Sequence, residues 1–388
     1  MFKKNYLNLV YLTFLGAISA FSLPPYNFFI INFITFTLFF IFIFNKKKIF
    51  STHKSFFKYG WCFGFGYFLS GLYWVSISLT FDQTFKFFIP FSIILMPAFL
   101  AIFYGLISYL FSVFYSKKVV VSFLIFSILF GLIELIRGVI LTGFPWNLIA
   151  FSFSESLNFL QILSIIGTYS FNLICISLFT CPSLLILKRS KSEILACSFF
   201  IVVAIIFLIF GVIKNNQFEL VKKTKHDYSI RVVSSDISLH RFYSNNEELE
   251  IINELITLSN PEKNKPTIFL WPEGIIPDTY LSDMKIYKDL FLNNFSSNHI
   301  IIMGIKSVEI HNDNNLYFNS LAVFDNQLNL LKSYNKVNLV PFGEFIPFRN
   351  IFSKIGFRTI TNQYQSYSKG SSRKIINIKN DKIELSLL

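Results

Sequence analysis

The chain has 388 residues, of which 53% are hydrophobic, and its mean hydropathy is +0.54. These values argue against a purely soluble enzyme or binding module. The formal net charge of +13 would suit a nucleic-acid-binding protein, but its distribution does not. Residues 1–213 carry +10 and residues 214–388 only +3, so the basic excess belongs to the hydrophobic half and nucleic acid is not expected as a partner.

Long apolar blocks fill the first half of the chain. A helix needs roughly 20 apolar residues to cross a bilayer. Seven segments meet or approach this length: Tyr6–Leu23, Tyr26–Phe44, Tyr59–Thr80, Phe87–Tyr115, Val119–Ile136, a helix within Leu157–Leu187, and Ile194–Ile213. The first leads straight into the second without a convincing cleavage site, so we interpret it as a retained helix and not as a signal peptide. The fourth is the weakest prediction, because Pro90 and Pro97 interrupt it.

The basic residues between these segments predict their orientation. Twelve lie on one side, before the first segment and in the loops that follow the second, fourth and sixth. The loops of the other side hold only Lys86 and Arg137. By the positive-inside rule the N-terminus is therefore cytoplasmic, and seven crossings place residue 214 onward outside; an even number of crossings would reverse this.

The region after the fifth segment departs from plain apolar sequence. Glu134 and Arg137 are close to one helical turn apart and are expected to pair at the membrane edge. Gly143 and Pro145 should end the helix, and Trp146 suits an interface. Two interpretations stay open: an ordinary interfacial loop with an ion pair, or a re-entrant segment that opens laterally for a lipid.

The cysteines and histidines predict no metal site. Cys62, Cys175, Cys181 and Cys197 all lie in apolar segments, so small buried side chains are expected and not disulfides or ligands. Residues 214–388 contain no cysteine, and the five histidines of the chain show no ligand spacing.

From about residue 228 strand-like and helix-like runs alternate. The predicted elements are strands at Ser229–Val233, Thr267–Trp271 and His299–Ile305, helices at Asn246–Leu258 and Ser282–Phe295, and a hairpin of Ser320–Phe324 with Leu328–Tyr334. Repeated β-α-β units predict a layered α/β domain. The expected organisation is thus a transmembrane helical domain at 1–213 and an extracytoplasmic α/β domain at 214–388.

Two spots in the second half carry candidate chemistry. Glu273 lies just past a buried strand, where active sites of α/β folds gather. Lys336 and Glu344 are eight residues apart, around another strand-like run. Taken singly, each also fits an ordinary surface loop. Together, a carboxylate and an ammonium form a workable base and oxyanion stabiliser that lack only a nucleophile.

Several motifs in order carry a resemblance to a known family. They are Leu23-Pro24-Pro25-Tyr26, Gly64–Phe68, Gly71–Trp74, Gly143–Asn147, Glu155–Leu157, Leu163–Tyr169, Trp271-Pro272-Glu273, Asn319-Ser320-Leu321 and Tyr334–Pro347. Almost end to end, the chain resembles apolipoprotein N-acyltransferase, a membrane enzyme with a nitrilase-like domain. The resemblance implies a polytopic α-helical membrane domain followed by an α/β nitrilase-like layered sandwich.

The resemblance also implies an activity. Glu273 matches the general base, Lys336 the lysine that stabilises the oxyanion, and Glu344 a supporting carboxylate. A cysteine would take an acyl chain from a membrane phospholipid as a thioester and pass it to the N-terminal α-amine of a diacylglyceryl-cysteine apolipoprotein. No metal or organic cofactor is implied. The implied location is the bacterial inner membrane, multi-pass, with the second domain periplasmic.

One departure bears on activity. The family's nucleophilic cysteine would follow directly after Glu384–Leu388, so we expect the α/β domain to be incomplete and residues 1–388 alone to be inactive. Three explanations of the missing cysteine remain open. The chain is a fragment of a longer product, or it is a truncated paralogue that binds lipid or lipoprotein without catalysis, or another chain completes the site. Val233–Ile237 also departs from the family's usual strand end. A transporter is disfavoured, because Glu134 is nearly the only ionisable residue within a span.

Overall fold

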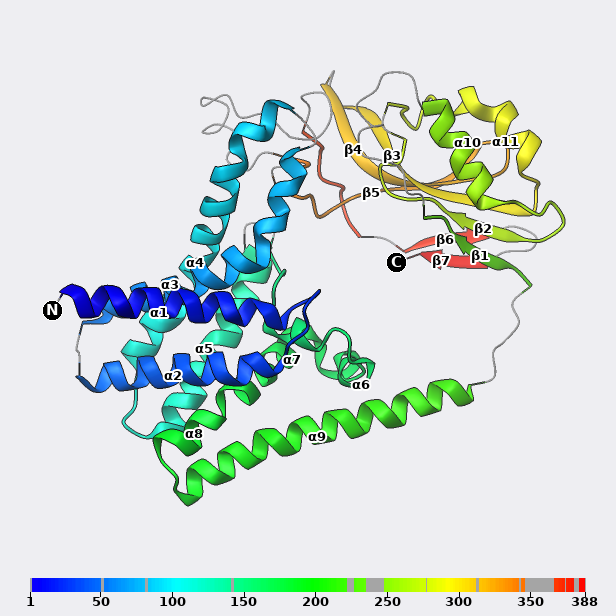
Figure 1. Ribbon diagram of the computed structural model, residues 1–388. Coiled ribbons are helices and arrows are strands. Elements are labelled where there is room, and N and C mark those ends of the chain that lie inside the picture. The colour runs from blue at the N-terminus through cyan, green and yellow to red at the C-terminus, as the bar shows by residue number, and fades with distance from the viewer. Residues whose placement is uncertain are drawn as a thin grey trace. The chain divides into compact units, whose positions relative to one another are not determined.

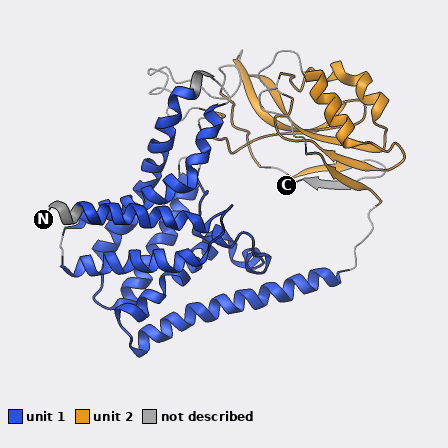
Figure 2. Ribbon diagram, viewed as in Figure 1, with its two compact units in different colours: residues 1–222 blue, residues 223–388 orange. Residues whose placement is uncertain are grey.

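The chain forms two compact units, residues 1–222 and 223–388 (Figures 1 and 2). The computed structural model describes residues 2–49, 52–80, 83–140, 143–221, 227–234, 248–276, 278–311, 314–341, 343–345, 366–373, 375–379 and 384–387. The last helix of the first unit runs to Leu220, so this division falls later than residue 213. Each unit is described by itself below.

The first unit is helical. Its α-helices are α1 (Phe2–Ser19), α2 (Ile30–Ile49), α3 (His53–Leu72), α4 (Ile89–Phe114), α5 (Val119–Val139), α6 (Leu157–Leu160), α7 (Leu163–Thr180), α8 (Pro182–Leu187) and α9 (Lys191–Leu220). Short 3-10 helices are η1 (Ala20–Ser22), η2 (Tyr73–Thr80), η3 (Gln83–Phe88) and η5 (Ile149–Phe153). Among the described residues, six helical segments are long and apolar enough to cross a membrane, and Tyr6–Ser22 is a shorter apolar helix. The predicted membrane domain of about seven apolar helices is thus confirmed as a class of fold.

The fourth and sixth predicted segments are both present, with local irregularities. The fourth stays one helix, because Pro90 falls at the start of α4, where its missing N–H costs no intrahelical bond, and only Pro97 lies inside. The sixth is divided among α6, α7 and α8. Gly167 has a φ of +73° within α7, a conformation that glycine adopts without steric cost and that interrupts the regular helix.

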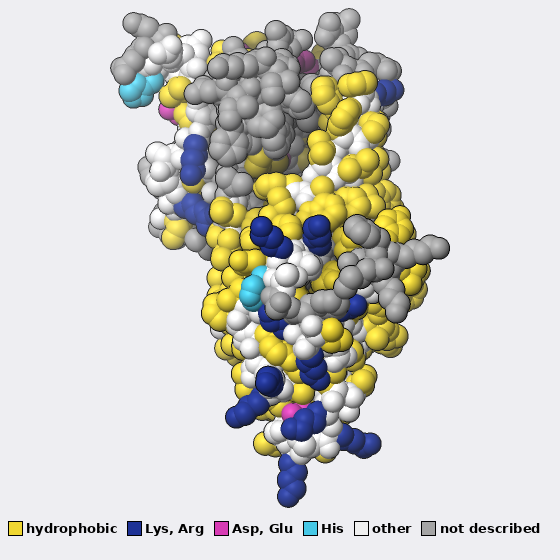
Figure 3. All heavy atoms as spheres, turned by 90° about the vertical axis from the view of Figure 1, so that its left-hand side faces the viewer, with side chains coloured by type: hydrophobic (Ala, Val, Ile, Leu, Met, Phe, Trp, Pro, Cys, Tyr) yellow, Lys and Arg dark blue, Asp and Glu magenta, His cyan; other side chains and the backbone are white. Residues whose placement is uncertain are grey.

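Phenylalanine rings form the interior of the first unit. Phe36, Phe39, Phe40 and Phe63 have no exposed surface, and the rings of Phe39 and Phe63 stack at 4.2 Å. Many other apolar side chains stay on the surface, as Figure 3 shows on one face, with Lys and Arg set among them. For α9 only 22% of the most apolar stretch is buried. Such a surface fits contact with lipid hydrocarbon and not with water.

A buried ion pair secures the chain after α5. The Arg137 Nη2–Glu134 Oε2 distance is 2.5 Å, and neither side chain has exposed surface. The guanidinium also donates to the carbonyl oxygens of Phe144 and Trp146, at 2.7 and 2.8 Å. It lies 5.2 Å from the ring centre of Phe68. The predicted ion pair is confirmed, and it holds the following loop as well as satisfying its own charge.

Loss of Arg137 should therefore destabilise the first unit. Arg137→Ala leaves the Glu134 carboxylate and two loop carbonyls without their donor, and we expect a loss of about 3–5 kcal/mol. Thermal unfolding in detergent, followed by circular dichroism, measures it. Lys118→Ala, at an exposed basic position, is the control. A double change of Glu134→Leu with Arg137→Met should recover much of the loss, and an unfolding temperature for Arg137→Ala equal to that of the wild type would contradict the account.

The second unit is built on a five-stranded mixed sheet. Its order is β1-β2-β3-β4-β5, formed by β1 (Ser229–Val232), β2 (Thr267–Leu270), β3 (His299–His311), β4 (Asn314–Phe324) and β5 (Leu330–Asn335). β1, β2 and β3 are parallel, and β4 and β5 are antiparallel additions. The crossovers are α10 (Glu248–Ser259) and α11 (Lys288–Asn294), the latter preceded by η7 (Met284–Tyr287).

Both faces of this sheet are covered. Ile252 and Leu255 of α10 and Phe291 of α11 pack with one apolar face, and Figure 1 shows both helices on that side. Ile376 and Ile378 of β6 (Ile376–Lys379), which pairs with β7 (Glu384–Leu387), pack with the other. The predicted α/β layering is thus confirmed. Because β2 and β3 are buried on both faces, their sequences are near-continuous apolar runs.

The predicted elements of this unit match, with two differences. β3 extends to His311 and β4 starts at Asn314, so the two form a longer hairpin than the apolar runs indicate. The strand-like run expected between Lys336 and Glu344 was wrong: it forms a loop, with only an isolated bridge at Pro341. Three predicted features lie partly outside the described residues. They are the helix at residues 246–247, the unusual strand end at residues 235–237, and the last motif at residues 342 and 346–347.

Candidate active site

Glu273 lies in the turn after β2. Trp271 precedes it, 5% exposed, with its indole N–H donating to Ser259 Oγ at 2.9 Å, so the start of the turn is anchored in the core. Gly274 follows with a φ of +64°, which favours glycine. Gly304 of β3 lies directly beneath: a Cβ there would be 2.6 Å from the Cα of Glu273. The Glu273 side chain itself is 62% exposed.

Lys336 follows the last residue of β5. Its backbone N–H donates to the carbonyl oxygen of Asn319 at 2.8 Å, and its carbonyl oxygen accepts from Gly370 at 2.9 Å. Its Nζ lies 3.0 Å from Glu273 Oε1 and 3.1 Å from Glu344 Oε1. The structure thus brings together all three residues that the sequence singles out, although they are up to 71 residues apart along the chain.

Glu344 is the buried member of the group, with 9% of its side chain exposed. Its Oε2 accepts the backbone N–H of Val340 at 2.7 Å, and its own backbone N–H donates to the Val340 carbonyl oxygen. The N–H of Tyr367 donates to the Glu344 carbonyl oxygen at 2.8 Å. These bonds hold the described residues of this loop, 336–341 and 343–344, without a strand ladder.

Asn319 completes the group and was not singled out as a site residue from the sequence. Its Nδ2 donates to Glu273 Oε1 and to Glu344 Oε1, both at 2.6 Å. The only sequence signal was its place in the motif Asn319-Ser320-Leu321. We call Glu273, Asn319, Lys336 and Glu344 the carboxylate cluster.

The cluster sets the charge of its own members. Burial would raise the pKa of Glu273, but hydrogen bonds from Lys336 and Asn319 outweigh it, and the pKa lies below its ordinary value. Burial would lower the pKa of Lys336, but its bonds to Glu273 and Glu344 hold that pKa above its ordinary value. The salt bridge between them is therefore kept at neutral pH. It is lost as pH falls through the pKa of Glu273 or rises through that of Lys336.

Tyr367 lies beside the carboxylate cluster. Burial raises its pKa to about 12, and the negative charges of Glu344 and Glu273 add to the rise, together with Tyr280. The phenol thus stays protonated near neutral pH and can donate a hydrogen bond. Nothing in the sequence patterns pointed to this residue.

Other reactive groups lie in the first unit. Cys175, Cys181 and Cys197 are buried among its helices and Cys62 is partly buried. Among the described residues no group of His, Cys, Asp or Glu could hold a metal ion.

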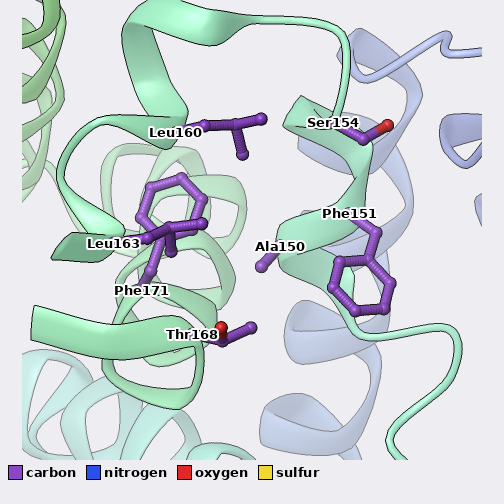
Figure 4. A pocket seen from close by; sticks show the side chains of 7 residues that line it. All are labelled: Ala150, Phe151, Ser154, Leu160, Leu163, Thr168 and Phe171. Carbon is purple, nitrogen blue, oxygen red and sulfur yellow. The ribbon is translucent and has the colours of Figure 1, made fainter. Parts of the chain in front are cut away.

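The first unit also holds a cavity. An apolar cavity of about 230 Å³ lies between η5 and the α6–α7 region, with Ala150, Leu163 and Phe171 among its lining residues (Figure 4).

Similarity to known proteins bears on what the cluster is. The sequence profile of the family described as "Apolipoprotein N-acyltransferase N-terminal domain" matches residues 15–181. The apolipoprotein N-acyltransferase of Rhizobium leguminosarum bv. trifolii is 29% identical over 93% of this chain and 70% of its own length. That of Brucella melitensis is 25% identical over 96% and 72%, and that of Rickettsia prowazekii 32% over 81% and 62%.

Over almost its whole length the chain is similar to apolipoprotein N-acyltransferases. The relatives match both units, since the alignments cover 93% or more of the chain in two of the three cases. This family is one of membrane acyltransferases, and the apolar helices of the first unit agree with that setting.

Gly304 should be needed to position Glu273 in the carboxylate cluster. In Gly304→Ala the new methyl group meets the Glu273 backbone, so the turn must shift and the 3.0 Å contact with Lys336 should lengthen or break. A structure of the variant measures that distance.

Gly343→Ala is the matched control. A Cβ there would be 3.4 Å from Val340 Cγ1, an ordinary contact in the same loop as Glu344. An unchanged Lys336–Glu273 distance in Gly304→Ala would show that the turn adapts without disturbing the cluster.

Proposed function

We propose that the gene product transfers an acyl chain from a membrane phospholipid to the N-terminal α-amine of a diacylglyceryl-cysteine apolipoprotein. The observation that carries this proposal is the carboxylate cluster, in which Lys336 Nζ bonds one oxygen of Glu273 while Glu273 Oε2 has no partner among the described residues, in a chain similar to acyltransferases. The reaction needs a group that takes and returns one proton and a cation that meets a developing oxyanion.

The proposed chemistry balances over two half-reactions. Glu273 accepts the proton of a cysteine thiol, and the thiolate attacks the phospholipid ester carbon. Lys336 stabilises the tetrahedral oxyanion, the carbon–oxygen bond breaks, and the lysophospholipid leaves with the proton from Glu273. The acceptor amine then attacks the thioester, gives its proton to Glu273, and the released thiolate takes it back.

The thiol has to come from outside the second unit of residues 1–388, which contains no cysteine. All four cysteines lie on or between helices of the first unit, where Cys175, Cys181 and Cys197 are buried and Cys62, on α3, is partly buried. We propose that the thiol is supplied by a cysteine that is not among residues 223–388; the relatives are longer than this chain, which covers 70% and 72% of two of them.

Replacement of the base or the lysine should abolish transfer. In the full gene product, Glu273→Gln removes the proton acceptor and Lys336→Met removes the oxyanion partner, and we expect each to lower the rate at least ~10²-fold. The assay follows a fluorescent phospholipid donor and a diacylated peptide acceptor.

Matched controls separate chemistry from surface charge. Lys332 is exposed on β5, four residues before Lys336, and Glu250 is exposed on α10. The control variants are Lys332→Met and Glu250→Gln. Both should retain wild-type rates. Normal turnover in Glu273→Gln or Lys336→Met would remove that residue from its role. A gene product with no cysteine in its second unit would favour a lipid- or lipoprotein-binding protein instead.

We further propose that the second unit faces the periplasm at a bacterial inner membrane. The support is the clustering of basic residues at one side: α1 begins, α2 ends and α8 turns into α9 on the same side of the first unit (Figure 1). Lys46, Lys47 and Lys48 lie in the last turn of α2. With Tyr6–Ser22 counted as a crossing, seven helices carry the chain from inside to outside.

Reporter fusions test this topology. Alkaline phosphatase fused after Val221 should be active and green fluorescent protein at the same site dark, because each reports one side of the inner membrane. The same pair fused after Ser116, at the α4–α5 turn, should give the opposite result. A fluorescent fusion after Val221 would show that the number of crossings is even.

A further inference from the structure

Four polar atoms of the carboxylate cluster form a closed ring. Glu273 Oε1 accepts from Lys336 Nζ at 3.0 Å and from Asn319 Nδ2 at 2.6 Å. Glu344 Oε1 accepts from the same two nitrogens, at 3.1 and 2.6 Å. Each donor therefore bridges both carboxylates, and each of these oxygens receives two donors.

The amide must face the carboxylates with its NH2 group. An ionised carboxylate only accepts, so an amide oxygen in that place would repel both glutamates. Two carboxylates and one ammonium leave the ring with a net charge of −1. Asn319 supplies two further N–H donors without adding charge, which offsets the repulsion between the glutamates.

The two glutamates are not equivalent within the ring. Both oxygens of Glu344 are occupied, since Oε2 accepts from the Val340 N–H, and the side chain is 9% exposed. Glu273 uses only Oε1 with described residues, its Oε2 has no partner among them, and its side chain is 62% exposed. The ring thus leaves one oxygen free, on the exposed glutamate.

We propose that Asn319 is a positioning residue that holds both glutamates around Lys336 and so leaves Glu273 Oε2 as the free proton acceptor. The inference rests on the proposed function for its catalytic meaning, but the geometry stands without it. Asn319 acts through its backbone and its side chain. Its backbone carbonyl oxygen accepts the Lys336 N–H at 2.8 Å, and its side-chain amide donates to both carboxylates.

The β-sheet register places Asn319 for this role. It lies opposite Lys306 on β3, and the next residue, Ser320, pairs with Asn335 on β5. Ser320 Oγ donates to Asn335 Oδ1 and also contacts Ser307 Oγ, both at 2.7 Å, so polar side chains tie β4 to both neighbours beside the ring. A shift by one residue would turn the amide to the other face of the sheet.

An infrared titration of the carboxyl groups tests the proposal. Spectra of the protein in detergent are recorded across pH, and Glu273→Gln identifies the Glu273 band. Asn319→Asp adds a third carboxylate and should move the Glu273 midpoint up by about one pH unit or more. Asn319→Ala removes only the donors and should move it up by less.

The charged and titratable neighbours of Glu273 are Lys336, which bonds it, Tyr367, which interacts with it, and Glu344, which shares its two donors; Tyr280 interacts with Tyr367, and Lys306 lies opposite Asn319 on β3. All of them are the same in all variants. Asn315→Asp, exposed on the same strand, is the control and should leave the midpoint unchanged. Unchanged midpoints in both Asn319 variants would overturn the proposal. The titration requires no turnover, so this failure is distinct from an absence of acyl transfer.

In an active gene product a second readout applies. The low-pH limb of kcat/KM should move with the Glu273 midpoint in Asn319→Asp, while KM for the phospholipid stays constant. A rate lowered equally at every pH would indicate a structural role for Asn319 and contradict the positioning role.

Discussion

The second unit depends on one ammonium group shared between two carboxylates. Without Lys336, Glu273 and Glu344 would oppose each other across the Asn319 amide, and like charges at hydrogen-bond distance from one donor cannot both stay ionised cheaply. With it, the net charge of the group falls from −2 to −1, and the loop after β5 is held to the turn after β2. The strands and loops around the carboxylate cluster position the residues that make the contacts with Lys336.

These supports come from different levels of structure. Parallel pairing of β2 with β3 places Glu273 above Gly304, and antiparallel pairing of β4 with β5 places Asn319 beside Lys336. Backbone hydrogen bonds from Tyr367 and Gly370 then hold the loop from outside. In the first unit the Glu134–Arg137 pair also holds a loop in place. A buried guanidinium is stable only when its N–H groups are hydrogen-bonded, and those of Arg137 bond both Glu134 and carbonyl oxygens of the loop after α5.

The sequence predicts elements better than contacts. Apolar length finds the membrane helices, and short apolar runs find β1, β2 and the core of β3, since burial dictates both patterns. Glu273, Lys336 and Glu344 were identified by resemblance and by place after strands. Asn319 was not, because its role depends on the register of three strands. The loop of residues 336–344 was misread as a strand because its apolar residues resemble one, while its backbone bonds come from distant segments.

The central claim is that Glu273 and Lys336 form a working base and oxyanion partner. Intact-protein mass spectrometry of the full gene product with phospholipid and no acceptor tests it most directly. The account predicts a mass increase of one acyl chain in the wild type, bound as a thioester that hydroxylamine releases, and none in Glu273→Gln or Lys336→Met. An adduct that forms as fast in either variant as in the wild type would contradict it.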